Sequence, residues 1–553
     1  MRAWFRTGTP WIWLNAGAIA LCLVMVIGVL GLILVQGASH FWPADLHTVQ
    51  AKQADGSVKR LLAEEVRSEE VAASVLRDSG VVLDSADLVY ERQLLKLGNR
   101  DVYGRDFAWF LSKDLSDRQE PSDATVIERR EWGNFYGFPQ QLLEGDKVVA
   151  QGDALWAELV VRIDRANKIH DEITEIEKGD IGVINKGLEE LRLTKRRMQL
   201  EGASAEQVAA YEQQANQEKA DLDAQYAVLQ QQLEALYAEA RRDSLVAVTA
   251  EGKTLTISLS NIVHAFQPNN MSLLDKIGHY FGAIYAFLSD DPREANTEGG
   301  IFPAIFGTIT MVMLMAIIVT PFGVLAAIYL REYAKQGTML KIIRISVYNL
   351  AGVPSIVYGV FGLGFFVYIM GGSIDQLFYP ESLPAPTYGT PGLFWASLTL
   401  ALLTLPVVIV STEEGLSRIP STIRMGSLAL GATKSETLWK VVVPLATPAM
   451  MTGLILSIAR AAGEVAPLML VGVVKLAPTL PIDGNFPFIH LDQKIMHLGF
   501  HVYDVGFQSP NVEASRPLLY ATALVLVLLI VLLNAVAIHL RNKLREKYRS
   551  ESD

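Results

Sequence analysis

The sequence has very little cysteine and few charged residues. Cys22 is the only cysteine among 553 residues, which excludes intrachain disulfides and zinc sites built from cysteine. Charged residues make up 19% of the chain, whereas soluble domains carry about 25%, so the composition favours a membrane protein. The net charge of −11 argues against a nucleic-acid-binding protein that relies on phosphate contacts. We therefore expect no disulfide, no metal site and no nucleic-acid partner.

A nucleotide-binding phosphate loop is also missing. The nearest match begins at Gly431 and reads Gly-Ala-Thr-Lys-Ser, which lacks the Gly-Lys pair of the G-x4-G-K-[ST] motif. No Ser–His–Asp or metalloprotease motif stands out either. We expect a protein that is not an enzyme, needs no cofactor, and neither binds nor hydrolyses ATP by itself.

Hydrophobic residues, in contrast, make up half of the chain and are strongly segregated. Residues 1–37 carry two charges, both basic, and residues 301–553 carry 17 basic and 14 acidic residues. Residues 38–300 hold 45 acidic and 29 basic residues, a net charge of −16. This distribution is typical of a membrane protein with one large acidic insertion outside the membrane.

Six segments are apolar over the roughly 20 residues that a membrane-spanning helix requires, namely Trp11–Val35, Phe302–Leu330, Ile342–Met370, Leu393–Ser411, Pro448–Val474 and Leu518–Leu540. The first lacks a cleavage site, so we interpret it as an anchor and not as a removed signal peptide. Lys and Arg gather before the first span and after the second, fourth and sixth, whereas residues 371–390 contain none. The positive-inside rule then predicts cytoplasmic termini and a periplasmic segment 38–300 in a bacterial inner membrane.

The insertion, residues 38–295, is expected to combine two kinds of structure. Short apolar runs separated by turns indicate a small α+β unit. Apolar residues at three- and four-residue spacing predict an antiparallel coiled-coil hairpin at about 153–243. Its helices are expected to break between Gly179 and Gly187. Gly202 is expected to interrupt the second arm, which a capping box of Ser204 and Gln207 restarts. The hairpin serves either as a rigid spacer or as a docking arm for a partner protein.

The loop that follows the fourth span, residues 413–445, has a pattern that a simple connection would not need. It begins with Glu413-Glu414 and continues through Arg424-Met425-Gly426-Ser427 to Gly431-Ala432 and Val441-Val442-Val443-Pro444. Small residues, a glycine and a proline at this spacing describe a short helix, a tight turn and a return to the membrane, because glycine permits the turn and proline needs no backbone donor at a helix start.

In this loop the chain resembles the permease subunits of binding-protein-dependent ABC importers, whose coupling signature reads E-A-A-x3-G-x9-I-x-L-P. Met425 replaces the leading glutamate, while the spacing from Gly431 to Pro444 is intact. Two further motifs, Ala351-Gly352-Val353-Pro354-Ser355-Ile356-Val357-Tyr358-Gly359 and Arg460-Ala461-Ala462-Gly463-Glu464, are similar to the phosphate-specific branch of this family. The similarity covers about residues 295–545 and leaves the insertion out.

The resemblance implies a permease that translocates inorganic phosphate, driven by a separate cytoplasmic ATPase dimer. It also implies a second permease subunit and a periplasmic phosphate-binding protein as partners, besides membrane lipid. ATPase coupling is then assigned to a set in the loop, namely Glu413, Glu414, Arg424, Gly431, Ala432 and Pro444. The substrate pathway is assigned to Ser355, Tyr358, Arg460 and Glu464.

Elementary chemistry supports part of this assignment. Arg460 and Glu464 lie four residues apart within an apolar segment, and charged residues at membrane depth usually face a cavity or the bundle interior. A guanidinium offers an oxyanion two parallel donors, which favours a role in the pathway or its gating; the alternative is a structural ion pair that stabilises helix packing. Pro354 and Gly359 are expected to kink the third span, either to expose backbone donors or only to allow packing. His497 and His501 are expected to be exposed loop residues.

The expected fold is therefore an all-α membrane protein with six transmembrane helices and the ABC importer permease fold, plus an α+β periplasmic insertion with a coiled-coil hairpin. Its parts are the N-terminus with the first helix (1–37), the insertion (38–295), a five-helix core (296–545) and a cytoplasmic tail (546–553). Two other functions remain open. A membrane-anchored periplasmic sensor or regulatory subunit for phosphate signalling would use the insertion, and an ion-driven secondary carrier would lack the coupling loop.

Overall fold

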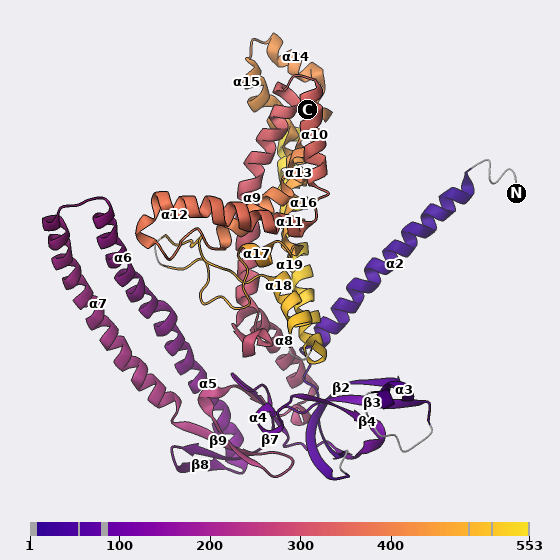
Figure 1. Ribbon diagram of the computed structural model, residues 1–553. Helices are drawn as coiled ribbons and strands as arrows, with labels where there is room; N and C mark the ends of the chain where they lie inside the picture. The colour runs from indigo at the N-terminus through magenta and orange to yellow at the C-terminus, as the bar shows by residue number, and fades with distance from the viewer. Residues whose placement is uncertain (1–7, 54–55, 79–86, 485–486, 510–511, 551–553) are drawn as a thin grey trace. The chain divides into compact units, whose positions relative to one another are not determined.

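The computed structural model describes residues 8–53, 56–78, 87–484, 487–509 and 512–550 (Figure 1). The chain divides into two compact units. One unit consists of residues 1–40, 288–292 and 300–553 and contains the apolar helices. The other consists of residues 41–287 and 293–299 and contains most of the acidic insertion.

Among the described residues, the insertion unit contains two large antiparallel sheets besides the short pairing of β12 Pro292–Arg293 with β13 Glu298–Gly299. The five-stranded sheet has the order β4-β3-β2-β1-β5. Its strands are β1 Leu46–Lys52, β2 Val58–Ala72, β3 Val89–Lys96, β4 Phe107–Leu111 and β5 Leu115–Gln119. The short helix α3 Ala73–Asp78 follows β2. The six-stranded sheet has the order β10-β9-β7-β6-β11 with β8 beside β7, and its strands are β6 Thr125–Arg129, β7 Phe135–Glu144, β8 Lys147–Gln151, β9 Asp243–Val248, β10 Thr254–Ser258 and β11 Ile262–Phe266. Strands β9 and β10 follow the hairpin along the chain, and β9 pairs with both β7 and β10.

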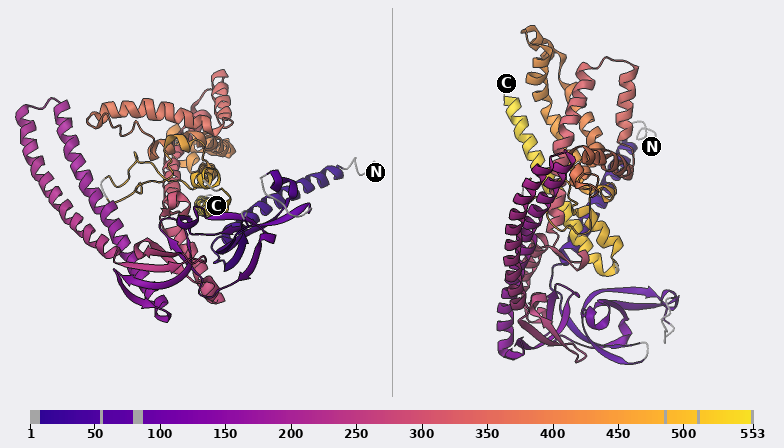
Figure 2. Two further views of the ribbon diagram at one scale, coloured as in Figure 1. Left: turned by 60° about the horizontal axis from the view of Figure 1, so that its bottom comes forward. Right: turned by 60° about the vertical axis from the view of Figure 1, so that its left-hand side comes forward.

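A long helical hairpin projects from the six-stranded sheet, as Figure 2 shows. Its first arm is α5 Asp153–Glu175 and α6 Ile181–Leu200, joined without a break by a π-helical turn at Ile176–Asp180, and its second arm is α7 Ala205–Ala240. Near the sheet the arms share a small apolar core of Ile169, Ile173, Leu233 and Ala240. The antiparallel pair is present as predicted, whereas supercoiling of its helices stays a prediction.

The position of the hairpin turn corrects the prediction. No break occurs between Gly179 and Gly187, because the π-helical turn keeps the chain helical there. The chain reverses instead at Glu201–Ala203, where Gly202 has a φ of +77°. The capping box is confirmed, since the Gln207 amide donates to the Ser204 hydroxyl and the Ser204 amide donates to the Gln207 side chain.

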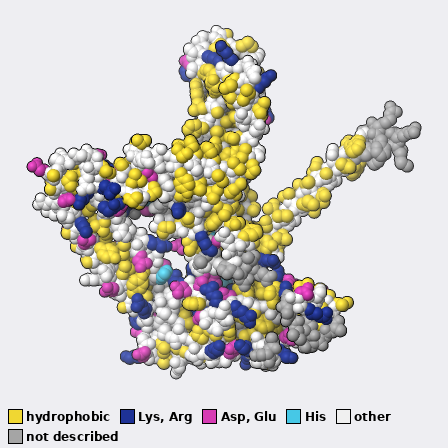
Figure 3. All heavy atoms as spheres, viewed as in Figure 1, with side chains coloured by type: hydrophobic (Ala, Val, Ile, Leu, Met, Phe, Trp, Pro, Cys, Tyr) yellow, Lys and Arg dark blue, Asp and Glu magenta, His cyan; other side chains and the backbone are white. Residues whose placement is uncertain are grey.

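The membrane unit is helical. Its helices are α2 Thr9–Ser39, α9 Phe302–Ile328, α10 Thr338–Leu350, α11 Ser355–Phe361, α12 Gly372–Phe378, α13 Leu393–Arg418, α14 Ser421–Ala429, α15 Lys434–Thr437, α16 Val443–Gly463, α17 Leu468–Val471, α18 Leu498–Tyr503 and α19 Val512–Ser550. Short π-helical turns extend several of them. Hydrophobic side chains line the face of α2 that Figure 3 shows, as expected of a helix surrounded by lipid.

Within the described residues, six helices are long and apolar enough to span a membrane, namely Trp11–Ser39, Phe302–Tyr333, Ser355–Phe378, Leu393–Arg418, Lys434–Gly463 and Ser515–Glu546. The predicted number is confirmed, but two boundaries are wrong. The third span begins at Ser355 and not at Ile342, because α10 is a separate helix. The fifth begins earlier than Pro448, at Lys434, and ends at Gly463, because the loop helix α15 continues into α16 through a π-helical turn.

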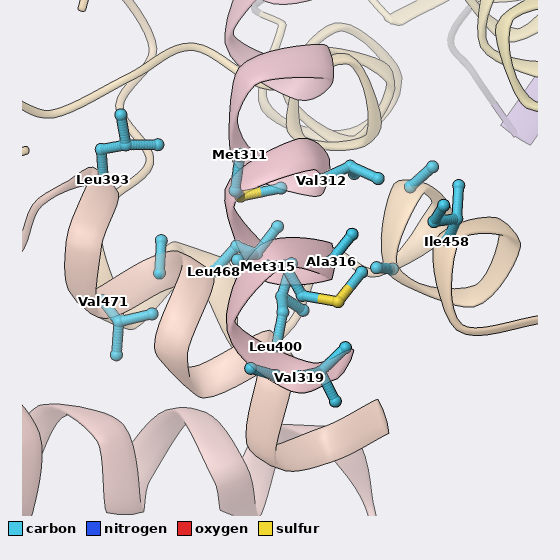
Figure 4. Packing of buried hydrophobic residues seen from close by; sticks show 14 of the residues in the cluster. Met311, Val312, Met315, Ala316, Val319, Leu393, Leu400, Ile458, Leu468 and Val471 are labelled. Carbon is cyan, nitrogen blue, oxygen red and sulfur yellow. The ribbon is translucent and has the colours of Figure 1, made fainter. Parts of the chain in front are cut away.

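The core of the membrane unit lies around α9 and α13. Met311, Met315 and Val319 follow one another at four-residue spacing on α9 and are buried. They pack against residues of α13, α16 and α17 (Figure 4), among them Leu400, Ile458, Leu468 and Val471. The core therefore holds together residues as far apart in the sequence as Met311 and Val471.

Candidate functional site

The third apolar segment is interrupted beside the predicted substrate pathway. Helix α10 ends at Leu350, and the chain turns before Pro354, which precedes α11 in an extended conformation. The Tyr358 hydroxyl donates to the Leu350 carbonyl at 2.5 Å, which satisfies one of the carbonyls that a helix end leaves unpaired. Ser355 is half-buried at the start of α11. The predicted kink is thus a complete break, bridged by the buried Tyr358.

Gly359 brings a second motif to this break. A Cβ atom at Gly359 would lie 2.7 Å from the Pro467 Cα and 2.9 Å from the Pro467 carbonyl oxygen. Only a glycine therefore lets α11 approach the backbone that follows α16 so closely. Since that backbone begins at Glu464, the two sequence motifs lie side by side although about 100 residues separate them.

Arg460 and Glu464 occupy the end of α16. Arg460 lies in the last helical turn, where the helix dipole favours a cation, and Glu464 caps the helix with extended backbone. The Arg460 Nε and a Glu464 carboxylate oxygen are 3.4 Å apart. The two side chains are 37% and 19% exposed in this chain alone, so the pair is accessible and not sealed in a core.

Gly359, the residue after Tyr358, lies against Pro467, three residues after Glu464. The structure thus brings together Tyr358, Arg460 and Glu464, and places Ser355 one turn before Tyr358 on the same helix. A guanidinium with remaining N–H donors can bind an oxyanion through two parallel hydrogen bonds. The carboxylate next to it can hold the guanidinium when no anion is present.

The loop 413–445 folds into the predicted helix and turn. Helix α14 ends in a turn in which the Gly431 amide donates to the Leu428 carbonyl and the Ala432 amide donates to the Ser427 carbonyl. This Schellman pattern requires a left-handed residue after the helix, and Gly431 has a φ of +87°. Thr433 then forms a capping box with Glu436 that starts α15. The π-helical turn Leu438–Val442 precedes Pro444, whose missing amide the continuing helix α16 accommodates.

Two of the predicted coupling residues brace this loop from inside. The Arg424 guanidinium donates to Glu332 and to the Leu416 carbonyl, both at 2.8 Å, and Glu413 forms an ion pair with Arg344. Glu414, in contrast, is exposed and lies 3.7 Å from Arg418. Arg424 and Glu413 therefore position α14 and α13, while Glu414 faces outward.

The sequence reasoning missed the apolar surface of α14. Met425, Leu428 and Leu430 are 57%, 47% and 90% exposed, and Ile423 is 38% exposed. Large apolar side chains on a short loop helix are normally buried against the rest of the protein. Their exposure here is typical of a surface that contacts another protein. The signal was present as Ile-x-Met-x-x-Leu-x-Leu, but its significance depends on knowing that the helix buries none of these residues.

The expected exposure of His497 and His501 is wrong. The two residues are 1% and 2% exposed, because α18 packs against α9, where the Leu498 amide donates to the Thr308 hydroxyl at 2.9 Å. Burial lowers the pKa of His497 to about 3 and, together with the nearby Lys475, lowers that of His501 to about 4, although Asp504 opposes the shift. Among the described residues no group of three His, Cys, Asp or Glu could hold a metal.

Buried neutral histidines predict a loss of stability in acid. Below pH 6.5 the unfolded chain binds protons that the folded histidines do not, so the free energy of unfolding falls as the pH drops from 6.5 to 4. The slope is about 1.4 kcal/mol per pH unit for each histidine. Thermal unfolding of the purified protein at several pH values should show this slope, and the variant His497→Asn with His501→Gln should show a smaller one. Asparagine keeps an acceptor for the Gly499 amide, which now donates to His497 Nδ1. Equal slopes would contradict the prediction.

Comparisons with known proteins match the membrane unit. Residues 319–546 match the family model described as "Binding-protein-dependent transport system inner membrane component". The chain is 37% identical over 194 residues to the phosphate transport system permease protein PstA of Mycobacterium leprae, which covers 35% of this chain and 58% of that protein. It is 29% identical over 256 residues to the probable phosphate transport system permease protein PstA of Methanocaldococcus jannaschii, covering 45% of this chain and 78% of that protein.

A solved structure of the MetNI methionine ABC transporter aligns with 44% of this chain and 94% of that chain, at 17% identity and a TM-score of 0.33. The chain spans a little over half of the length of its relative from Mycobacterium leprae. The matched residues 319–546 include the interrupted third span, the loop 413–445 and the Arg460–Glu464 pair. The resemblance inferred from the sequence is therefore confirmed.

Proposed function

We propose that this chain is the permease subunit that translocates inorganic phosphate across the inner membrane. Its residues 319–546 match the family model of binding-protein-dependent transport system inner membrane components. Two relatives named as phosphate transport permeases support phosphate as the substrate. The observation that carries the proposal is the Arg460–Glu464 pair at the end of α16, next to the break before α11. A bidentate cation beside an interrupted helix provides what a tetrahedral oxyanion needs in a membrane, namely donors at a place where backbone irregularity is tolerated.

In this proposal the energy comes from a separate ATPase dimer that docks on the loop 413–445. The exposed apolar side chains of α14 provide the contact with the ATPase, and Glu414 lies at the edge of this contact. Gly431 and Ala432 form the turn after α14, and Pro444 lies where the chain returns to the membrane. Arg424 and Glu413 hold the loop against Glu332 and Arg344, so that movement of the loop is transmitted to α9, α10 and α13. A second permease subunit and a periplasmic phosphate-binding protein complete the assembly.

Radiolabelled uptake tests the substrate. A strain deleted for this subunit should regain phosphate uptake when the chain is supplied, and unlabelled phosphate should compete strongly, whereas sulfate and phosphonate should compete weakly. Equal competition by sulfate would overturn the assignment to phosphate. No uptake of any oxyanion, with the chain present in the membrane, would overturn the transport function itself.

The predicted orientation gives a separate test. The Lys and Arg distribution predicts cytoplasmic termini and a periplasmic segment 38–300. A reporter enzyme that is active only in the periplasm should therefore work when fused near Gly202, at the tip of the hairpin, and fail at Gly337 or Lys543. Activity at Gly337 with none at Gly202 would reverse the orientation.

A further inference from the structure

Helix α8, Leu273–Ser289, has an exposed face that is almost entirely apolar. Five side chains at three- and four-residue spacing form this face, and their exposed fractions are Leu274 80%, Ile277 38%, Phe281 63%, Tyr285 74% and Leu288 39%. At 100° per residue these positions fall within an arc of about 100°, which is the width of the apolar stripe of an amphipathic helix. In α8 the stripe faces away from the unit that the helix belongs to.

The opposite face of α8 holds the polar groups and packs onto the insertion unit. Lys276 Nζ lies 2.5 Å from a carboxylate oxygen of Asp45, and the His279 ring lies 4.2 Å from the ring of Phe266. Phe287 is 5% exposed and its ring lies 5.1 Å from that of Phe41. The helix is thus inverted relative to a surface helix of a soluble protein, whose apolar stripe faces inward.

Chain continuity places α8 at a membrane surface. Phe41 comes two residues after Ser39, the last residue of the first span, and it contacts Phe287 near the C-terminal end of α8. The second span begins at Phe302, 13 residues after α8 ends. Trp42 is 43% exposed and its ring lies 6.0 Å from that of Tyr280. Because Phe41 and Trp42 contact the middle and the C-terminal end of α8, chain connectivity keeps this part of the helix close to the end of the first span.

We propose that α8 is an interfacial helix, which lies in the plane of the membrane with its exposed stripe inserted at the boundary between lipid headgroups and acyl chains. A helix with a strong apolar face of Leu, Ile and Phe, and with its lysine on the other face, has the composition of such helices. Tyr285, Trp42 and Tyr280 match the preference of these aromatic side chains for the interface. Inserted in this way, α8 anchors the insertion unit to the lipid that surrounds α2 and α9.

Continuity with the two spans favours lipid over a protein partner. None of the five side chains of the stripe can form an ion pair with a partner protein. A partner protein that bound the stripe would also have to displace lipid, because the chain on either side of α8 leads to a membrane-spanning helix. Insertion removes apolar surface from water without requiring a complementary protein surface. The inference rests on α8 and its neighbours alone and holds whatever the transported substrate is.

Nitroxide labels on the full-length protein test the proposal. Cys22 is first replaced by serine, and single cysteines at Leu274, Phe281 and Tyr285 are then labelled. The protein is reconstituted into vesicles of phosphatidylethanolamine and phosphatidylglycerol, and collisions of each label with oxygen and with a nickel chelate are measured. Labels at Ile19, on the lipid-exposed α2, and at Glu218, exposed on the hairpin helix α7, serve as matched standards for lipid and water.

The ratio of oxygen to nickel accessibility at Leu274 and Tyr285 should be at least threefold higher than at Glu218 and should approach the ratio at Ile19. A ratio equal to that of Glu218 would place the stripe in water and overturn the proposal. Low accessibility to both reagents would show a protein cover, such as a partner subunit or a second copy, and would also overturn it. Because Leu274 and Tyr285 are the most exposed members of the stripe, their replacement removes little packing, so the outcome does not depend on Phe281→Cys folding.

Discussion

Replacing Gly431 with valine should reduce phosphate uptake to less than a tenth while the protein still inserts into the membrane. Gly431 has a φ of +87°, and a residue with a Cβ atom costs about 1–2 kcal/mol in this left-handed conformation, more when it is β-branched. A Cβ atom would meet nothing within 4 Å, so the cost is one of backbone conformation and not of crowding. The strain should unravel the Schellman turn and displace the exposed Leu428 and Leu430, on which docking of the ATPase depends.

Gly426 provides the matched control for this prediction. It lies in the middle of α14 with helical backbone, and a Cβ atom there also meets nothing within 4 Å. Gly426→Ala should therefore keep normal uptake, because alanine stabilises a helix relative to glycine by about 0.5–1 kcal/mol. Gly431→Asn should lie between the two, since asparagine tolerates left-handed backbone. The measurements are uptake, membrane level and co-purification of the ATPase. Full uptake and undiminished co-purification for Gly431→Val would rule out the loop as the coupling element.

Arg460→Lys should abolish uptake almost as completely as Arg460→Ala, with at least a tenfold loss in each case. A lysine retains the positive charge but is a point donor, whereas the guanidinium offers two parallel N–H groups in a fixed plane. Arg460 is 37% exposed, so an anion can reach it. Arg418→Lys serves as a control, because Arg418 forms a similarly spaced but more exposed pair with Glu414 and should tolerate the change.

The double variant Arg460→Ala with Glu464→Ala separates substrate binding from structural pairing. If the pair only balanced charge, removing both members would leave no unpaired charge and should restore function. We expect instead that the double variant assembles with its partners, as judged by co-purification, but does not transport phosphate. Uptake near the wild-type rate would show that the pair is structural.

The spans and the coupling turn could be predicted because their signals are local. A run of about 20 apolar residues identifies a candidate membrane-spanning helix, and the predicted number of six agrees with the structure although the third and fifth begin at other residues. The turn at Gly431 and the capping box at Ser204 depend on residues within five positions of each other. The hairpin turn was misplaced because glycines at 179, 182 and 187 resemble a break, while the π-helical turn keeps the helix continuous by widening one turn.

The pathway residues were identified from their motifs, but their convergence was not predictable. Whether Tyr358 lies beside Arg460 depends on Gly359 meeting Pro467 across more than 100 residues of chain, and no periodicity encodes such a contact. Glu413 and Arg424 were assigned to coupling by their place in the loop. Their ion pairs with Arg344 and Glu332 depend on how α10 and the end of α9 fold back onto α13.

The sequence by itself determined that this protein has six segments apolar enough to span a membrane, that it carries a large acidic insertion with a helical hairpin, and that its loop 413–445 turns at Gly431. Each of these follows from hydropathy, charge or backbone preference over a short stretch. The tertiary structure alone decided which polar residues are buried and which apolar ones are exposed. His497 and His501 are buried because α18 packs on α9, and the apolar face of α8 is exposed because Lys276 and Phe287 occupy the packed side. An amphipathic pattern defines two faces of a helix, but only packing against distant residues decides which face meets the protein.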